Sequence, residues 1–239
     1  MLSDLSGASV LEIGCGWGGF AELAARERDL QVRGISLSRE QLRYAESRIE
    51  AAALSKQVGF EFRDYRDYGP SDAQYDGVVS IEMYEAVGER YWPAYFQAIS
   101  DRLRPGAHAV VQGITIAERL FERYREGSDF IQQYVFPGGM LATPSRIEAE
   151  AARAGLMLVD RFAFGRDYAE TLRRWHAAFV ENLDPVRALG FDERFIRTWK
   201  FYLAYCEAAF DAGCCDVFQF TFMKGAAPGR RVEPCSKAN

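Results

Sequence analysis

Short apolar runs alternate with stretches of helical spacing from residue 9 to residue 117. The apolar runs cover 9–13, 30–35, 58–62, 75–81 and 107–116 and are expected to be strands. The fourth, 75–81, is rich in Val and Ile, as is typical of a strand buried on both faces of a parallel sheet. Helices are expected at 18–26, from Ser38 onward and at 91–103, and a turn is expected at 104–106. This order predicts an α/β fold in which helices cover a parallel sheet.

The pattern changes after residue 116, where the helical stretches become longer and more aromatic. Helices are expected at 118–127, 129–134, 143–154, 168–182 and 193–212, and strands at 157–164 and 215–224. The aromatic side chains of the last two helices predict a lid over an apolar pocket. We therefore expect a single domain at 1–224, with a core at about 9–117, lid and C-terminal elements at about 118–224, and a disordered tail at 225–239.

Composition excludes several classes of protein. The 239 residues carry 29 Lys and Arg against 34 Asp and Glu, a net charge of −5, so binding of nucleic acid through bulk charge is not expected. No run of about 18 apolar residues predicts a transmembrane helix, and the N-terminus lacks the layout of a signal peptide. The five cysteines have neither zinc-ligand nor disulfide spacing, so we expect a cytoplasmic protein without a metal site.

A glycine-rich turn follows the first strand and gives the clearest chemical signal. Gly14, Gly16 and Gly18 let the backbone bend tightly and approach a ligand, and the helix that follows presents unpaired N–H groups. The spacing differs from the Gly-x-Gly-x-x-Gly of dinucleotide sites, and an acid, Glu12, precedes the first glycine. We expect Glu12, the three glycines and Cys15 to bind a cofactor; the alternative is a strand-helix turn with no ligand.

Polar residues follow the second and third strands, where a nucleoside would lie. Ser36 and Gln41 are candidates to hydrogen-bond ribose hydroxyls, although Gln41 is equally well explained as a solvated residue after the helix cap Ser38. Asp64 offers an acceptor for an adenine amine, and Tyr65 an aromatic face for the ring. Acidic and aromatic turns are common, so this second signal is weak alone.

The turn resembles motif I of the class I S-adenosylmethionine (SAM) methyltransferases, and four further motifs follow it. The five motifs are Gly14–Gly19, Ser36–Ser38 with Gln41, Ser80–Gly88, Phe136–Gly139, and Phe164–Tyr168 with Thr171, Leu172 and Trp175. Together they resemble the cyclopropane fatty acid synthases and mycolic acid cyclopropane synthases from about Val10 to Met223. This resemblance implies a Rossmann-like class I methyltransferase sheet with helices on both faces and a helical lid insertion, with SAM as cofactor.

The resemblance also implies a reaction: the methyl group of SAM is added to the cis double bond of an unsaturated phospholipid acyl chain. A base then removes a proton from the new methyl group so that the cyclopropane can close, and in the family that base is thought to be bicarbonate. Carried over residue by residue, the bicarbonate site would comprise Glu85, the backbone N–H of Ile114, the Tyr168 phenol and Gln112, which stands where the family usually has histidine. An amide donates a hydrogen bond but cannot titrate. The substrate implies contact with the inner membrane surface, and a homodimer is allowed.

Other interpretations remain open. Cys206 matches a cysteine long regarded as an active-site residue of the family, but a small buried apolar side chain on a lid helix explains it equally well. Glu85 is also explained as a charge at a helix N-terminus. Because Gln112 replaces histidine and the family's N-terminal cysteine segment has no match, two alternative functions stand. One is methylation of another hydrophobic small molecule, and the other is an inactive SAM-binding fragment.

Overall fold

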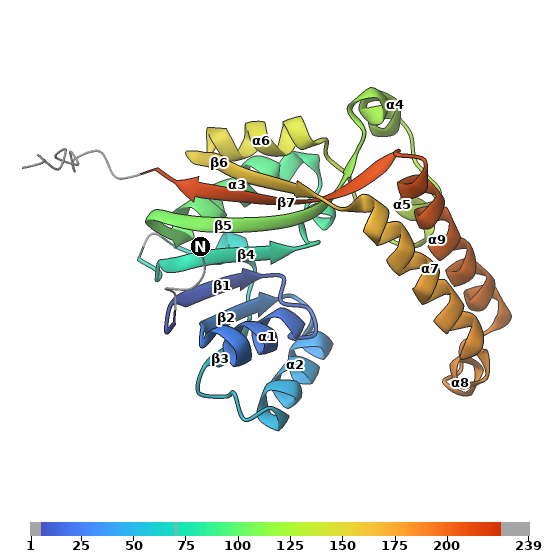
Figure 1. Ribbon diagram of the computed structural model, residues 1–239, viewed down its shortest axis with the longest axis horizontal. Coiled ribbons are helices and arrows are strands. Elements are labelled where there is room, and N and C mark those ends of the chain that lie inside the picture. Colours follow the sequence, from blue (N-terminus) through green and yellow to red (C-terminus); the bar gives the residue numbers. More distant parts are fainter. Residues whose placement is uncertain (1–5, 70, 226–239) are drawn as a thin grey trace, which may run out of the picture.

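The computed structural model describes residues 6–69 and 71–225. Within them one sheet has the strand order β3-β2-β1-β4-β5-β7-β6 (Figure 1). The first five strands of this order are parallel, and β7 runs antiparallel to both β5 and β6. The strands are β1 Ser9–Ile13, β2 Gln31–Ser36, β3 Val58–Phe62, β4 Tyr75–Ile81, β5 Leu103–Ile116, β6 Leu156–Ala163 and β7 Cys215–Lys224. The predicted α/β sheet is confirmed.

Helices cover both faces of the sheet, because alternate residues of a strand point to opposite faces. On β1, Val10 packs with the apolar side of α1 and α2, whereas Leu11 and Ile13 pack into the core beneath α3 and α6. The helices are α1 Gly19–Arg28, α2 Arg39–Ala51, α3 Trp92–Arg102, α4 Phe121–Glu126, α5 Phe130–Tyr134, α6 Pro144–Arg153, α7 Gly165–Glu181, α8 Leu183–Ala188 and α9 Glu193–Asp211.

An aromatic cluster fixes the segment that follows β4. Tyr84 is fully buried, stacks on Trp92 with ring centroids 5.2 Å apart, and also contacts Tyr95 and Phe96 of α3. Burying each of these side chains contributes on the order of 2 kcal/mol or more. The cluster therefore holds the short 3-10 helix Tyr84–Ala86, and with it the preceding turn, against the carboxyl ends of β4 and β5.

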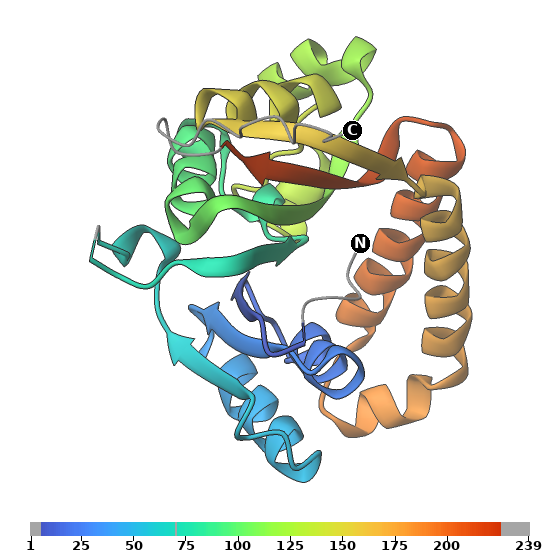
Figure 2. The same cartoon turned by 60° about the vertical axis from the view of Figure 1, so that its left-hand side comes forward.

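Two long helices stand beside the carboxyl ends of the parallel strands. Figures 1 and 2 show α7 and α9 side by side, joined by α8, on the side to which the arrowheads of β1 and β4 point. Leu172 of α7 and Leu203 and Phe210 of α9 form a small core with Val217 of β7. The helices are therefore anchored to the sheet and also face the edge where α/β folds bind ligands.

The structure departs from the sequence expectations in places. The turn expected at 104–106 is wrong, because β5 begins at Leu103 and carries these residues through a register shift in its pairing with β4. Helix α8 was not expected. The tail expected at 225–239 lies outside the described residues apart from Gly225, and the division into core and lid near residue 117 stays a prediction. Among the described residues, none of the helices combines the length and apolarity needed to span a membrane.

Candidate functional site

The glycine turn has a backbone that favours glycine. Gly14 and Gly18 have φ of +83° and +79°, and the backbone N–H groups of Gly14 and Cys15 both donate to the Ile35 carbonyl of β2. A Cβ atom on Gly14 would lie 2.8 Å from Cγ of Met83. Gly18 precedes α1, and among the described residues no side chain caps that helix. The turn therefore presents helix N–H groups and a surface without side chains, as a ligand-binding loop requires.

Glu12 carries an uncompensated carboxyl group directly beneath this turn. It is 3% exposed, and its Oε2 has no hydrogen-bond partner among the described residues. Burial raises the pKa of Glu12 to about 8. Burial and the nearby Glu12 raise the pKa of Cys15 to about 12, so its thiol is neutral. A buried carboxyl without a cation is costly, and the ammonium group of SAM would supply the missing partner. The residues present therefore fit SAM.

The polar residues after β2 lie together, as the sequence predicts. The Ser36 hydroxyl donates to Oε1 of Gln41 at 3.2 Å, and the Ser38 N–H donates to the Ser36 Oγ at 3.1 Å. Ser38 caps α2 by accepting from the N–H of Gln41, which confirms the predicted cap. Ser36 directly follows Ile35, whose carbonyl binds the glycine turn. The pair is thus placed beside the turn, and its role toward ribose stays a prediction.

Asp64 and Tyr65 are engaged within the protein. The Asp64 carboxylate accepts from the backbone N–H, Nε and Nη2 of Arg66, and the Arg66 side chain is the main cause of its lowered pKa. Tyr65 is buried and packs edge-on against Tyr95, with centroids 5.6 Å apart. Asp64 is thus paired with Arg66 and the Tyr65 ring packs on Tyr95, and their predicted contacts with adenine stay untested.

A cavity of about 840 Å³ lies between the carboxyl end of the sheet and the helices α4, α5, α7 and α9. Most of its wall is apolar or aromatic. Aromatic side chains of α7 and α9 form part of this wall, which explains why these helices are rich in aromatic residues. Among the residues that line it are Glu82, Glu85, Ile114, Tyr124, Met140, Tyr168, Leu172, Trp175, Tyr202 and Cys206. The predicted apolar pocket under the long helices is therefore present.

Glu82 forms a polar cluster on the cavity wall. Its Oε1 accepts from Nε2 of Gln112 at 2.8 Å, and its Oε2 accepts from the Tyr168 phenol at 2.7 Å. The Gln112 Oε1 in turn accepts from Nε2 of Gln219 at 2.9 Å, so both ends of that amide are fixed. Burial, followed by the Glu82 charge, raises the pKa of Tyr168, which keeps its proton for this hydrogen bond. The structure thus joins two predicted site residues through one carboxylate.

Glu82 stands in the motif Ser80–Gly88, but it is not among the site residues predicted from the sequence. Glu82 follows β4 at once and has φ of +51°, a left-handed conformation that is uncommon for a residue other than glycine. Its own N–H donates to the Gln112 carbonyl at 2.9 Å. A charged residue in a strained conformation at the carboxyl end of a central strand is the signal that identifies it.

Glu85 lies next to this cluster in the 3-10 helix after β4. Its Oε1 accepts from the Ile114 N–H at 2.5 Å, while its Oε2 is buried without a partner among the described residues. Burial raises the pKa of Glu85 to about 7. The helix-dipole interpretation of Glu85 is replaced by this contact, because the side chain reaches across to the backbone of β5.

The donors expected to hold bicarbonate are all engaged with carboxylates of the protein. The Ile114 N–H donates to Glu85, and the Gln112 amide and Tyr168 phenol donate to Glu82. A second anion placed there would face the Glu82 carboxylate and would have to displace the hydrogen bonds that Glu82 and Glu85 accept. The residues present therefore do not fit bicarbonate, and no reaction step is assigned to it here.

Cys206 lies on α9 and lines the same cavity. It is partly buried, and burial raises the pKa of its thiol to about 11. A thiol with this pKa is almost fully protonated near neutral pH, so it is a poor nucleophile. This favours the apolar wall interpretation over a reactive one.

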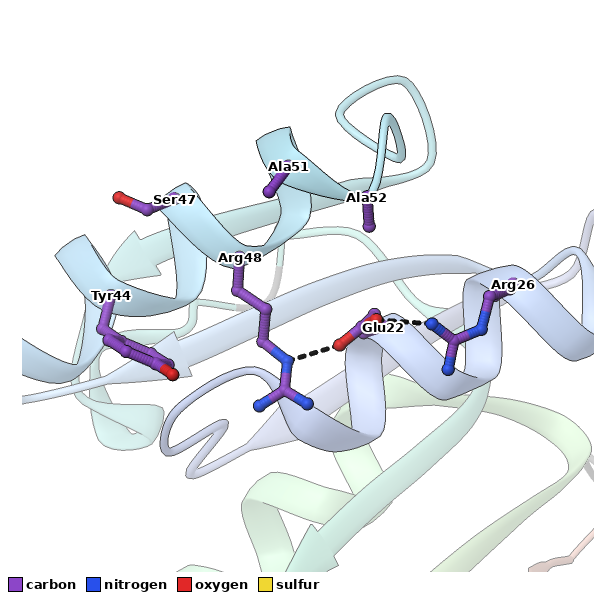
Figure 3. Close-up of a pocket in the computed structure, with 7 residues that line it drawn as sticks. All are labelled: Glu22, Arg26, Tyr44, Ser47, Arg48, Ala51 and Ala52. Atoms are coloured by element: carbon purple, nitrogen blue, oxygen red, sulfur yellow. Dashed lines mark hydrogen bonds and ion pairs between the residues drawn. The ribbon is translucent and has the colours of Figure 1, made fainter.

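A second recess lies on the outer surface between α1 and α2 (Figure 3). Glu22 stands in it between Arg26 and Arg48 and forms ion pairs with both, which lower its pKa. Since Glu22 offsets the two cations and the recess is open to solvent, this surface shows no feature of a ligand site.

Known proteins share both the sequence and the shape of this chain. The family model for mycolic acid cyclopropane synthetase matches residues 2–220. The chain is 43% identical to the tuberculostearic acid methyltransferase UfaA1 of Mycobacterium tuberculosis over 93% of its own length and 51% of that protein. It is 33% identical to the cyclopropane-fatty-acyl-phospholipid synthase of Escherichia coli K12, over 95% of this chain and 56% of that one.

The solved structure of mycolic acid cyclopropane synthase CmaA1, complexed with SAH and CTAB, superposes with a TM-score of 0.84 at 25% identity. The match covers 93% of this chain and 80% of that chain. The chain therefore has the Rossmann-like methyltransferase fold that the sequence predicts, and it spans about half the length of the curated relatives it matches. On the family match and these identities, the chain belongs to the mycolic acid cyclopropane synthetase family.

Proposed function

We propose that this chain transfers the methyl carbon of SAM to the cis double bond of an unsaturated fatty acyl chain, such as that of a membrane phospholipid. The product gains one CH₂ group after a proton is lost, as in a cyclopropane. The names of the family and of its relatives, which include a cyclopropane-fatty-acyl-phospholipid synthase and a tuberculostearic acid methyltransferase, support a lipid chain as substrate.

One observation carries the proposal. An apolar cavity of about 840 Å³ ends in a wall that bears Glu82, Glu85 and Tyr168, and this wall adjoins the glycine turn, because Met83 touches Gly14. The cavity has the size of a small-molecule site, and its apolar lining suits a hydrocarbon chain. Arg123, Ser128, Asp129 and Gln132 add polar groups on the side of α4 and α5.

The chain's residues would act mainly by positioning. SAM supplies an electrophilic methyl group on sulfur when it is bound. Glu12 would hold its ammonium group, the turn Gly14–Gly18 would hold its methionine portion, and Ser36 with Gln41 would bind the ribose. Aromatic residues of α7 and α9 would exclude water and keep the double bond in line with the methyl carbon, since alkenes are weak nucleophiles.

The proposed substrate also bears on membrane contact and on the oligomeric state. A phospholipid substrate requires contact with a membrane surface, so we propose peripheral contact from the cytoplasmic side. A homodimer is compatible with this proposal.

Incubation with SAM and vesicles of a cis-unsaturated phospholipid tests the function. The expected result is an acyl chain heavier by one CH₂ group, with loss of the double bond. Vesicles of the saturated phospholipid are the matched control. A product methylated on oxygen or nitrogen would support the alternative of another hydrophobic substrate, and SAM binding without any product would support a non-catalytic role. Either result would contradict the proposal.

A further inference from the structure

We propose that the Glu82 carboxylate is the proton acceptor of the reaction and that turnover does not require bicarbonate. This inference rests on the proposed function, and it assigns Glu82 a catalytic role that the sequence motifs alone did not reveal. The inference follows from the hydrogen bonds at the end of the cavity, where Gln112 and Tyr168 donate to Glu82.

The position of Glu82 meets the requirement for such a base. It lines the cavity at the carboxyl end of β4, next to Met83, which contacts the turn proposed to bind SAM. Its carboxylate is fixed at both oxygens, by Gln112 at 2.8 Å and by Tyr168 at 2.7 Å. A carboxylate fixed in this way keeps its position and orientation during the reaction.

The hydrogen-bond donors around Glu82 suit a side-chain carboxylate. An amide N–H and a phenol both stabilise a charged carboxylate, and neither can serve as a base at neutral pH. Gln112 is held in turn by Gln219, so its Nε2 stays directed at Glu82. The family usually has histidine at position 112. The glutamine found here therefore suits the Glu82 side chain as its partner better than a bound bicarbonate ion.

The backbone conformation adds independent support. Glu82 keeps φ of +51°, which costs a residue other than glycine roughly 1–2 kcal/mol. Such strain persists where the surrounding structure holds it, and here the two side-chain hydrogen bonds and the bond from the Glu82 N–H to the Gln112 carbonyl do so.

The electron pair of the double bond forms a C–C bond to the methyl carbon, and the S–C bond breaks with its pair going to sulfur. The other alkene carbon becomes a cation. An oxygen of Glu82 then takes a proton from the newly added methyl group, the electron pair of that C–H bond forms the third side of the ring, and the protonated Glu82 later releases its proton to water. No oxidant or reductant is needed.

Glu82→Gln tests the step, because it keeps the shape of the side chain and removes its charge. Turnover on cis-unsaturated phospholipid vesicles should fall roughly 100-fold or more, while calorimetric affinity for SAH should stay within about twofold of the wild type. The matched control is Glu40→Gln, an exposed partner of Arg43 on α2, which should leave both quantities unchanged. Wild-type turnover should be equal in carbonate-free buffer and in buffer with added bicarbonate.

Glu82→Gly is the second variant, since glycine accepts the backbone conformation and should fold well. It should be inactive alone and regain part of its turnover with added formate or bicarbonate, because Gln112 and Tyr168 are then available to hold a small anion. Near-normal turnover of either variant without an added anion, a wild type that needs bicarbonate, or Glu82→Gly that no anion restores would overturn the proposal. A wild type that binds SAH but alkylates no lipid would instead contradict the proposed function.

Discussion

Gly14 and Met83 are in contact across the carboxyl edge of the sheet, where a Cβ atom on Gly14 would lie 2.8 Å from the Met83 Cγ. Gly14 opens the turn after β1, and Met83 follows Glu82 after β4. The two strands are neighbours in the sheet. This contact couples the proposed SAM site to the wall of the apolar cavity, so that the methyl donor and the lipid chain would meet at the Glu82 cluster.

Gly14→Ala should weaken binding of SAH by about tenfold or more. The added Cβ would push Met83 away, and alanine at φ of +83° costs roughly 1–2 kcal/mol. Calorimetry measures the affinity. The control is Gly106→Ala, which has φ of +81° but no atom of the described residues within 4 Å of the new Cβ. Gly106→Ala should lower only the unfolding temperature, and equal losses of affinity in both variants would contradict the prediction.

Glu12→Gln should change stability and SAM binding in opposite directions. The folded pKa of Glu12 is about 8, above its ordinary value of 4.5, so the native state holds the proton longer than the unfolded chain. The contribution of Glu12 to stability therefore falls as pH rises from about 4.5 to about 8, by up to roughly 1.4 kcal/mol per pH unit. Urea unfolding across this range should show a smaller decline for the variant than for the wild type.

The same variant should bind SAM more weakly by at least about tenfold near pH 8, since it lacks the negative partner of the ammonium group. Glu40→Gln serves again as an exposed control. Unchanged SAM affinity in Glu12→Gln would show that Glu12 plays no part in the cofactor site.

Glu85→Ala should lower the free energy of unfolding by about 1–3 kcal/mol, because the partly buried Ile114 N–H loses its acceptor. Glu85→Gln keeps an oxygen at that place and should lose much less. Urea unfolding should be measured near pH 5. Because Glu85 has a pKa of about 7, its folded-state carboxyl is protonated there, and neither substitution changes the charge of the folded protein. Equal loss in the two variants would show that the hydrogen bond is not what stabilises this turn.

Cys206→Ala should keep turnover within about threefold of the wild type, because a thiol with a pKa of about 11 contributes packing rather than nucleophilic chemistry. Cys215→Ala is a suitable comparison, since Cys215 lines the same cavity and has a pKa of about 12. A loss of turnover of roughly 100-fold in Cys206→Ala with an unchanged unfolding temperature would contradict this assignment and favour the active-site interpretation.

Much of the fold follows from local patterns in the sequence. The runs Val58–Phe62 and Tyr75–Ile81 are strands with the predicted bounds, and Ser38 caps its helix as expected, because both signals depend on neighbouring residues. The strand β5 could not be delimited in this way. Its first residues, including Pro105, are typical of a turn. Leu103 pairs with Tyr75 and His108 with Gly77, so the residues between them lie in a register shift that becomes part of the strand.

The cofactor side of the site was predictable, whereas the catalytic cluster was not. Glu12 and the glycine turn are contiguous in sequence. Glu82 directly follows β4, Gln112 lies on β5 and Tyr168 on α7, so they meet only when the sheet and the long helices are assembled. The resemblance to the family indicated Gln112 and Tyr168, but their shared partner Glu82 required the structure.

The most direct test of the proposed proton transfer is to determine which hydrogen atom is lost. Mass spectrometry should follow a cis-unsaturated phospholipid incubated in carbonate-free buffer with SAM whose methyl group carries three deuterium atoms. The expected product is a lipid that has gained one carbon and kept two of the three deuterium atoms, since Glu82 removes the third from the methyl group. A lipid that keeps all three deuterium atoms, or no labelled lipid at all, would contradict it.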